Sequence, residues 1–150
     1  MDQLSQPNRD ELVVRLEIPA QFAFLALVSE CLRSVLQTRP AVWADEALSY
    51  NIQLAVQEVC TNTIKHAYPP AETKDHRIWL CVSLGQEKIS VKIEDTGVKF
   101  QLPEKEEVLL PDEPQEHGYG LFLIYSLVER VQYAYLNGRN CWLLEQSLPD

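Results

Sequence analysis

Residues 58–68 read E-V-C-T-N-T-I-K-H-A-Y and set polar side chains among apolar ones in the second half of a predicted helix. At about 100° per residue, the apolar residues of this helix form one arc, and Glu58, Asn62 and Lys65 fall in a stripe roughly 60° wide along its border. Carboxylates and amides are costly to bury unless they find partners. The stripe is therefore either a solvated helix edge or a flank that faces a polar ligand. The arc consists of Ile52, Val56, Val59, Thr63 and Ala67.

A second polar position ends the alternating stretch I-S-V-K-I-E-D-T-G, residues 89–97. Asp95 keeps the parity of the apolar residues before it, so we expect its carboxylate on the core face where the strand ends. One interpretation is that this carboxylate caps the turn at Thr96-Gly97. The other is that it accepts a hydrogen bond from a ligand amino group, with Gly97 letting that ligand approach the backbone.

A third stretch, H-G-Y-G-L-F-L-I at residues 117–124, places Gly118 and Gly120 at the start of a predicted helix. Free amide donors at the positive end of a helix dipole are suited to binding phosphate. Glycines at such a turn are also common for conformational reasons alone. The stretch lacks the lysine of a Walker P-loop, and no strand directly precedes it as a Rossmann fingerprint requires.

Periodicity elsewhere predicts one α+β domain over residues 1–150, a two-layer sandwich of a mixed, mainly antiparallel sheet with helices on one face. Residues 96–117 lack periodicity and contain three prolines and six acidic residues, which indicates a lid, a binding loop or disorder. The predicted elements are a strand at 12–18, helices at about 21–37 and 45–67, a hairpin at 78–93, a helix from 118 and a hairpin around Asn137-Gly138.

Composition narrows the function classes. The net charge of −9 argues against sequence-independent nucleic-acid binding, which needs a basic surface. The sequence shows no signal-peptide pattern and no apolar run long enough for a membrane span, so we expect a cytoplasmic protein that does not act at a membrane. The cysteines have neither zinc nor redox spacing and are expected as buried, reduced thiols. They are Cys31, Cys60, Cys81 and Cys141.

Together, the three stretches resemble the N, G1 and G2 boxes of the ATPase superfamily that includes gyrase, the heat-shock chaperones, histidine kinases and mismatch-repair proteins. Within it, the chain looks most like the anti-sigma-factor serine/threonine protein kinases. Their helix pattern E-A-x-T-N-A-x-x-H-A-Y corresponds to residues 58–68, D-x-G-x-x-F to 95–100, and G-x-G-L-x-L-I to 118–124. The resemblance covers about residues 10–148 and implies a Bergerat-type ATP-binding fold.

The resemblance implies a role for each polar residue of the helix. Asn62 would hold the Mg²⁺ that bridges the ATP phosphates, since hard cations favour such oxygen ligands. Glu58 would orient or deprotonate the attacking hydroxyl group. Lys65 would reach a phosphate.

The other two stretches would bind the remaining parts of the nucleotide. By the same resemblance, Asp95 beside Gly97 would accept from the adenine amino group, and residues 96–117 would form the lid. The backbone amides that would bind the phosphates belong to Gly118, Gly120 and Leu121.

The resemblance further implies a kinase that phosphorylates a small anti-sigma-factor antagonist in a partner-switching pathway. Its second partner would be a sigma factor or another effector, and the chain would pair as a homodimer. The alternative is a non-catalytic ATP/ADP-binding module that sequesters a regulatory partner. Glu58 and Asn62 favour the kinase, whereas the acidic 96–117 segment and His117, where the look-alikes often have glycine, favour the module.

Overall fold

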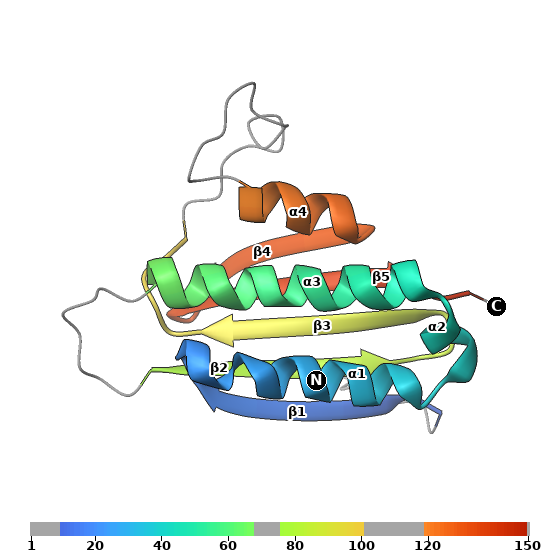
Figure 1. The fold of residues 1–150 in the computed structure, drawn as a ribbon. Coiled ribbons are helices and arrows are strands. Elements are labelled where there is room, and N and C mark those ends of the chain that lie inside the picture. The colour runs from blue at the N-terminus through green and yellow to red at the C-terminus, as the bar shows by residue number, and fades with distance from the viewer. Residues whose placement is uncertain (1–9, 68–75, 101–118, 150) are drawn as a thin grey trace, which may run out of the picture.

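The computed structural model describes residues 10–67, 76–100 and 119–149, in which five strands form one sheet of order β1-β2-β3-β5-β4 (Figure 1). All four neighbouring pairs are antiparallel, which confirms the expected, mainly antiparallel sheet. The strands are β1 (Leu12–Pro19), β2 (Arg77–Leu84), β3 (Lys88–Asp95), β4 (Arg130–Leu136) and β5 (Arg139–Ser147).

Three helices lie side by side on one face of this sheet, with α3 between α1 and α4 (Figure 1). The expected two-layer α+β architecture is therefore confirmed. The helical elements are η1 (Phe22–Phe24), α1 (Leu25–Gln37), α2 (Pro40–Ala44), α3 (Glu46–Asn62), η2 (Thr63–Ala67) and α4 (Tyr119–Leu127). None of the helices within these ranges is long and apolar enough to cross a membrane.

Two predicted helices are divided in the structure. The predicted 21–37 helix begins with the 3-10 turn η1, and the predicted 45–67 helix ends with the π-helical turn η2. Asp45 accepts a hydrogen bond from Leu48 N at 3.1 Å and so caps the start of α3, as the acidic residues there indicated. A helical wheel assumes the same rotation, about 100°, at every residue. Because the π turn winds differently, the wheel positions predicted for residues after Asn62 do not apply.

The core lies between the sheet and the helices, and both layers contribute buried apolar side chains to it. Alternate residues of β2 and β3 point into it, so the strand periodicity read from the sequence is confirmed. The helices contribute apolar stripes of their own. Among the fully buried core residues are Val28, Leu32, Ile52, Val56, Val59, Ile78, Val82, Leu84, Ile89, Val91, Ile93 and Leu144.

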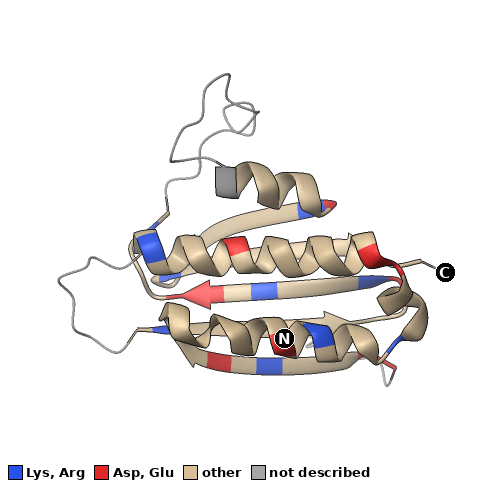
Figure 2. Ribbon diagram, viewed as in Figure 1, with Lys and Arg blue, Asp and Glu red and all other residues tan. Residues whose placement is uncertain are grey.

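Charged residues of both signs lie along β1 and β3 (Figure 2), among them Arg15 and Glu17 of β1 and Lys88, Lys92 and Glu94 of β3. Glu94 binds Lys92 at 2.8 Å and Arg139 at 3.1 Å, and these cations hold the pKa of its carboxyl below the usual range. The Arg139 guanidinium also lies 4.3 Å from the centre of the Trp79 ring. These contacts fix the start of β5 against β3 and β2 from the outer side.

The four cysteines are free thiols, as expected, and Cys60 of α3 is buried while the other three are half-buried. Burial, together with the nearby Asp95 carboxylate, raises the pKa of the Cys60 thiol to about 12. This thiol is therefore protonated and packs as an apolar core group.

Asn137 and Gly138 form the β4–β5 turn with φ angles of 53° and 77°. We expect Gly138→Ala to lower the free energy of unfolding by about 1–2 kcal/mol, because a side chain disfavours this left-handed conformation. A Cβ at Gly138 would have no heavy atom within 4 Å, so crowding adds nothing. Urea unfolding measures the loss. Gly85→Ala is the matched control, since its Cβ would lie 3.5 Å from Lys88 O, an ordinary contact, and an equal loss there would contradict the conformational explanation.

Candidate functional site

Asp95 ends β3 with its side chain on the core face, and it is 1 % exposed. Its Oδ1 accepts hydrogen bonds from Gly97 N at 2.8 Å and from Asn140 Nδ2 at 2.9 Å. Its Oδ2 receives the longer contact of the Thr63 hydroxyl, at 3.4 Å. Asp95 thus caps its own turn through one oxygen, and its other oxygen is the less fully bonded.

Burial raises the pKa of the Asp95 carboxyl, and the hydrogen bonds from Asn140, Gly97 and Thr63 partly offset that rise. Desolvation disfavours the charged form of an acid, whereas donors to its oxygens favour that form. A charged Asp95 at this position therefore lowers the free energy of unfolding. Such a cost is typical of a residue retained for binding.

The helix α3 places Glu58 and Asn62 one turn apart, and both are half-buried. The Gln57 side chain faces α1, where it donates to Leu25 O at 3.1 Å and to Ser29 Oγ. The stripe predicted for Glu58 and Asn62 lies on a different flank of the helix. Lys65 is exposed and lies in η2, beyond the regular part of the helix.

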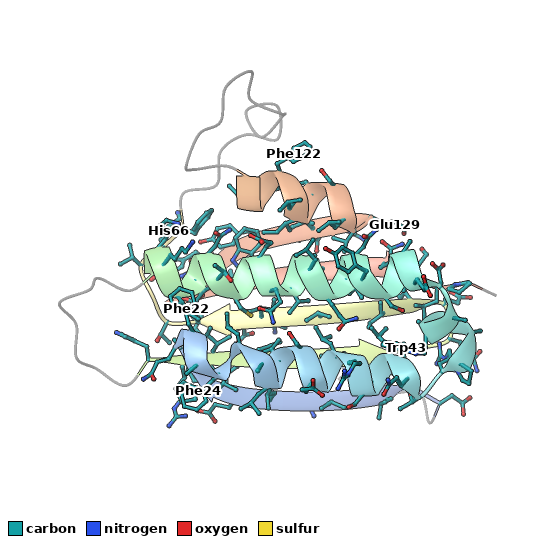
Figure 3. All side chains as sticks on the ribbon, in the orientation of Figure 1. Phe22, Phe24, Trp43, His66, Phe122 and Glu129 are labelled. Carbon is teal, nitrogen blue, oxygen red and sulfur yellow. The ribbon has the colours of Figure 1, made fainter. Side chains whose placement is uncertain are left out.

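The π turn joins the helix to Asp95. Asn62 is the last residue of α3, and Thr63, the first of η2, is 5 % exposed and contacts the Asp95 carboxylate. His66 lies toward the end of this turn, beside the helical layer (Figure 3). Two of the three stretches are therefore brought together, and Thr63, expected only as a core residue, connects them.

The third stretch is described only in part. Helix α4 begins at Tyr119, which agrees with the predicted start near Gly118 and Gly120. It runs antiparallel to α3 and packs against it, so its first turn lies toward the C-terminal half of α3 (Figure 1). Leu121 is 7 % exposed. Gly118 and the predicted lid beyond residue 100 lie outside the described residues.

Sequence reasoning missed Asn140, which is 1 % exposed and faces Asp95 across the β3–β5 pair. Its signal was readable, because Asn140 has the same strand parity as the buried Trp142 and Leu144. A polar residue at a core parity needs hydrogen-bond partners. Beside it, the Phe100 ring makes edge contacts with Trp142 and with Tyr133, at centroid distances of 5.5 and 6.0 Å.

Two surface hollows lie elsewhere on the described structure. One, of about 320 Å³, borders the β2–β3 turn, and the other, of about 590 Å³, is lined mainly by the outer residues of β3, β4 and β5. Neither is lined by Glu58, Asn62 or Asp95. The contact that links the helical side of the candidate site to β3 is that of the Thr63 hydroxyl with the Asp95 carboxylate.

An antiparallel sheet covered on one face by helices, with a carboxylate buried at the end of β3 and polar residues on the helix above it, is the arrangement of an ATPase domain of the Bergerat type. The chain belongs to the histidine kinase-like ATPase domain family, whose model matches residues 18–144.

Among curated proteins, the chain is similar to serine-protein kinases named RsbW. It is 27% identical over 126 residues to that of Bacillus subtilis, covering 79% of this chain and 76% of the relative. It is 29% identical over 132 residues to that of Listeria innocua, covering 83% of this chain and 81% of the relative. The expected resemblance to this group of kinases is therefore confirmed as a distant relationship.

A solved structure supports the fold. The RsbU and RsbW domains of Rv1364c from Mycobacterium tuberculosis match this chain with a TM-score of 0.65 at 18% identity. The match covers 92% of this chain and 33% of the solved one, so this chain spans about a third of that protein's solved length.

Proposed function

We propose that this protein is a Mg²⁺- and ATP-dependent serine/threonine kinase that phosphorylates a small anti-sigma-factor antagonist. The observation that carries the proposal is the contact of Thr63, at the end of α3, with the buried Asp95 carboxylate, which brings Asp95 next to the helix that carries Glu58 and Asn62. The similarity to serine-protein kinases over most of the chain supports it.

Asp95 would recognise the base. Its Oδ1 is occupied by two donors, so Oδ2 is the oxygen that can accept from an adenine amino group. Guanine carries an acceptor oxygen at the corresponding position, and two facing acceptors repel. The site would therefore prefer ATP to GTP.

Asn62 would contribute one oxygen to the Mg²⁺. Among the described residues no group of three His, Cys, Asp or Glu side chains could hold a metal by itself. That fits magnesium, which takes few protein oxygens and completes its octahedron with water and nucleotide phosphates. The ion would neutralise charge on the phosphates when bound.

Glu58 would act on the protein substrate. Its carboxylate takes the proton of the attacking serine or threonine hydroxyl as that oxygen forms its bond to the γ-phosphorus, and ADP leaves with the electrons of the broken P–O bond. Lys65 is exposed, and its long side chain would reach a phosphate. The amides of Gly118, Gly120 and Leu121 would donate to the phosphates. Gly120 and Leu121 lie in the first turn of α4, where N–H groups lack intrahelical acceptors.

The partners follow from the same proposal. The antagonist is the substrate, a sigma factor or other effector is the sequestered protein, and the chain works in the cytoplasm as a homodimer. The deciding experiment incubates the protein with Mg·ATP and a candidate antagonist and detects phosphoserine or phosphothreonine by mass spectrometry. An inert protein that still binds ATP and a partner would favour the second candidate, a nucleotide-binding module without catalysis.

Asp95→Asn should weaken ATP binding while preserving the fold. The variant retains an oxygen for Gly97 N and Asn140 Nδ2 but lacks the charge that attracts the adenine amine. One charge-assisted hydrogen bond is worth roughly 1.5–3 kcal/mol, a tenfold or larger fall in affinity. Calorimetric titration with Mg·ATP measures it. Equal binding of ATP and GTP by the parent would remove Asp95 as the base-recognising residue.

The same variant should change how stability depends on pH. Because burial raises the Asp95 pKa, the folded parent holds this proton more tightly than the unfolded chain does, and its stability falls as pH rises through the interval between the two pKa values. The variant lacks this loss. Denaturant unfolding at a series of pH values should show that the free energy of unfolding of the variant increases relative to that of the parent as pH rises. A parent that gains on the variant would mean that Asp95 is stabilised in its charged form.

A further inference from the structure

Asn140 is the most extensively bonded buried polar side chain described at this end of the sheet. Its Nδ2 lies 2.9 Å from Asp95 Oδ1, 3.0 Å from Val98 O and 3.3 Å from Gly97 O. Its Oδ1 accepts from Phe100 N at 3.0 Å and from the Tyr133 hydroxyl. One amide therefore holds Asp95 and the segment that follows it.

Asn140 occupies a position of β5 that faces the core. It has the strand parity of Trp142 and Leu144, both buried. A buried amide adds stability only when its hydrogen bonds are made, and removing it alone leaves its buried partners unpaired. The bonds of Asn140 go mainly to residues 95–100, which indicates that its task concerns that segment.

The decisive feature is which carboxylate oxygen the amide engages. Asn140 and Gly97 N both donate to Oδ1 of Asp95, at 2.9 and 2.8 Å, and thereby fix the rotation of the carboxylate. Oδ2 receives the longer contact of the neutral Thr63 hydroxyl, at 3.4 Å. Without the Nδ2 donor, Asp95 would be held at Oδ1 by the turn amide alone.

Strand β5 holds Asn140 firmly enough for this purpose. On the outer face, the preceding residue, Arg139, binds Glu94 at 3.1 Å and stacks on Trp79. On the inner face, Asn140 lies opposite Asp95 in the strand register. The start of β5 is thus attached to β3 on both faces.

We propose that Asn140 is a positioning residue that sets the base preference of the nucleotide site, by holding Asp95 Oδ1 so that Oδ2 is offered to the amino group of adenine. This inference rests on the proposed ATP site and adds to it a residue that need not touch the nucleotide.

The test compares Asn140→Leu, which has similar size and no donor, with Asn140→Ser, whose hydroxyl can still donate to Asp95. Titration calorimetry gives the affinities for Mg·ATP and Mg·GTP, and circular dichroism with thermal unfolding checks the fold. Cys141→Ala is the matched control, because Cys141 is the next residue of β5 and faces the opposite side of the sheet. If Asn140→Leu does not fold, Asn140→Ala replaces it with the same expectation.

We expect Asn140→Leu to bind ATP at least about tenfold more weakly and to lose its preference over GTP by a similar factor, which is the size of one hydrogen bond to a charged group. Asn140→Ser should keep most of the preference, and Cys141→Ala all of it. A residue that only stabilised the hairpin would weaken both nucleotides equally and leave their ratio unchanged.

The failures are distinguishable. An unchanged ATP-to-GTP ratio in Asn140→Leu, with the parent preferring ATP, would overturn the role of Asn140 and leave the proposed kinase intact. A ratio lost equally in the serine and leucine variants would overturn the donor explanation. A parent that binds no nucleotide would overturn the proposed function and this inference together.

Discussion

Glu58→Gln is expected to reduce phosphotransfer by about 10²–10⁴-fold, the usual contribution of a positioned general base, while the affinity for Mg·ATP stays within a few-fold of the parent. The amide keeps the size of the carboxylate but cannot take the proton of the attacking hydroxyl. Nucleotide affinity is spared because the metal, the backbone amides and Asp95 would supply most of the binding. Phosphorylation of a candidate antagonist, followed by mass spectrometry, gives the rate, and calorimetry gives the affinity.

Glu46→Gln is a matched control, since Glu46 is an exposed glutamate in the first turn of the same helix. It should phosphorylate as fast as the parent. Equal rates for Glu58→Gln and the parent would remove Glu58 from the mechanism. An inert parent would instead favour the non-catalytic module, so the parent must be assayed beside both variants.

Asn62→Ala is expected to lower the affinity for Mg·ATP by up to about 100-fold, the upper end of the roughly 10–100-fold losses found when groups that support a metal are removed. The fold should survive, because Asn62 is only half-buried at the border of the core. The affinity measured with EDTA in place of Mg²⁺ should be nearly the same in the variant and the parent. That comparison assigns the loss to the metal.

Asn51→Ala serves as the control for Asn62, since Asn51 is a half-buried asparagine on the same helix. It should bind Mg·ATP like the parent. If Asn62→Ala also bound Mg·ATP like the parent, Asn62 would not be the metal ligand. If it lost affinity equally with and without Mg²⁺, its role would lie in shaping the site.

Local patterns predicted which residues of the candidate site face the core, because such patterns depend on short-range geometry. Alternation along residues 89–95 placed the Asp95 carboxylate in the core, and the structure buries it. Helical periodicity placed Val59 and Thr63 in the core arc, and both are buried. The two-residue turn at Asn137-Gly138 likewise follows from backbone conformations that few residues adopt.

The rest depends on contacts between distant parts of the chain. Nothing in the alternation of β3 says that β5 is its neighbour, so the pairing of Asp95 with Asn140 could not be read from either strand. The sequence also carries no signal for the π turn after Asn62, because apolar residues keep their helical spacing through it. Asn140 and Thr63, the partners of the central carboxylate, were missed as site residues for these two reasons.

The β3–β5 pairing also determines when the proposed base-recognition site could form. The β2–β3 and β4–β5 pairs are hairpins, whereas Asp95 and Asn140 are 45 residues apart in the chain and meet only when the two hairpins join. Contacts between distant residues form slowly, because the intervening loop must close before they contribute. During synthesis, a chain that has left the ribosome only through β3 already contains Glu58, Asn62 and Asp95 but lacks the strand that orients Asp95. If Asp95 recognises the base as proposed, selective ATP recognition would therefore be acquired only after β5 has been made, and a chain that lacks β5 could not compete for the nucleotide.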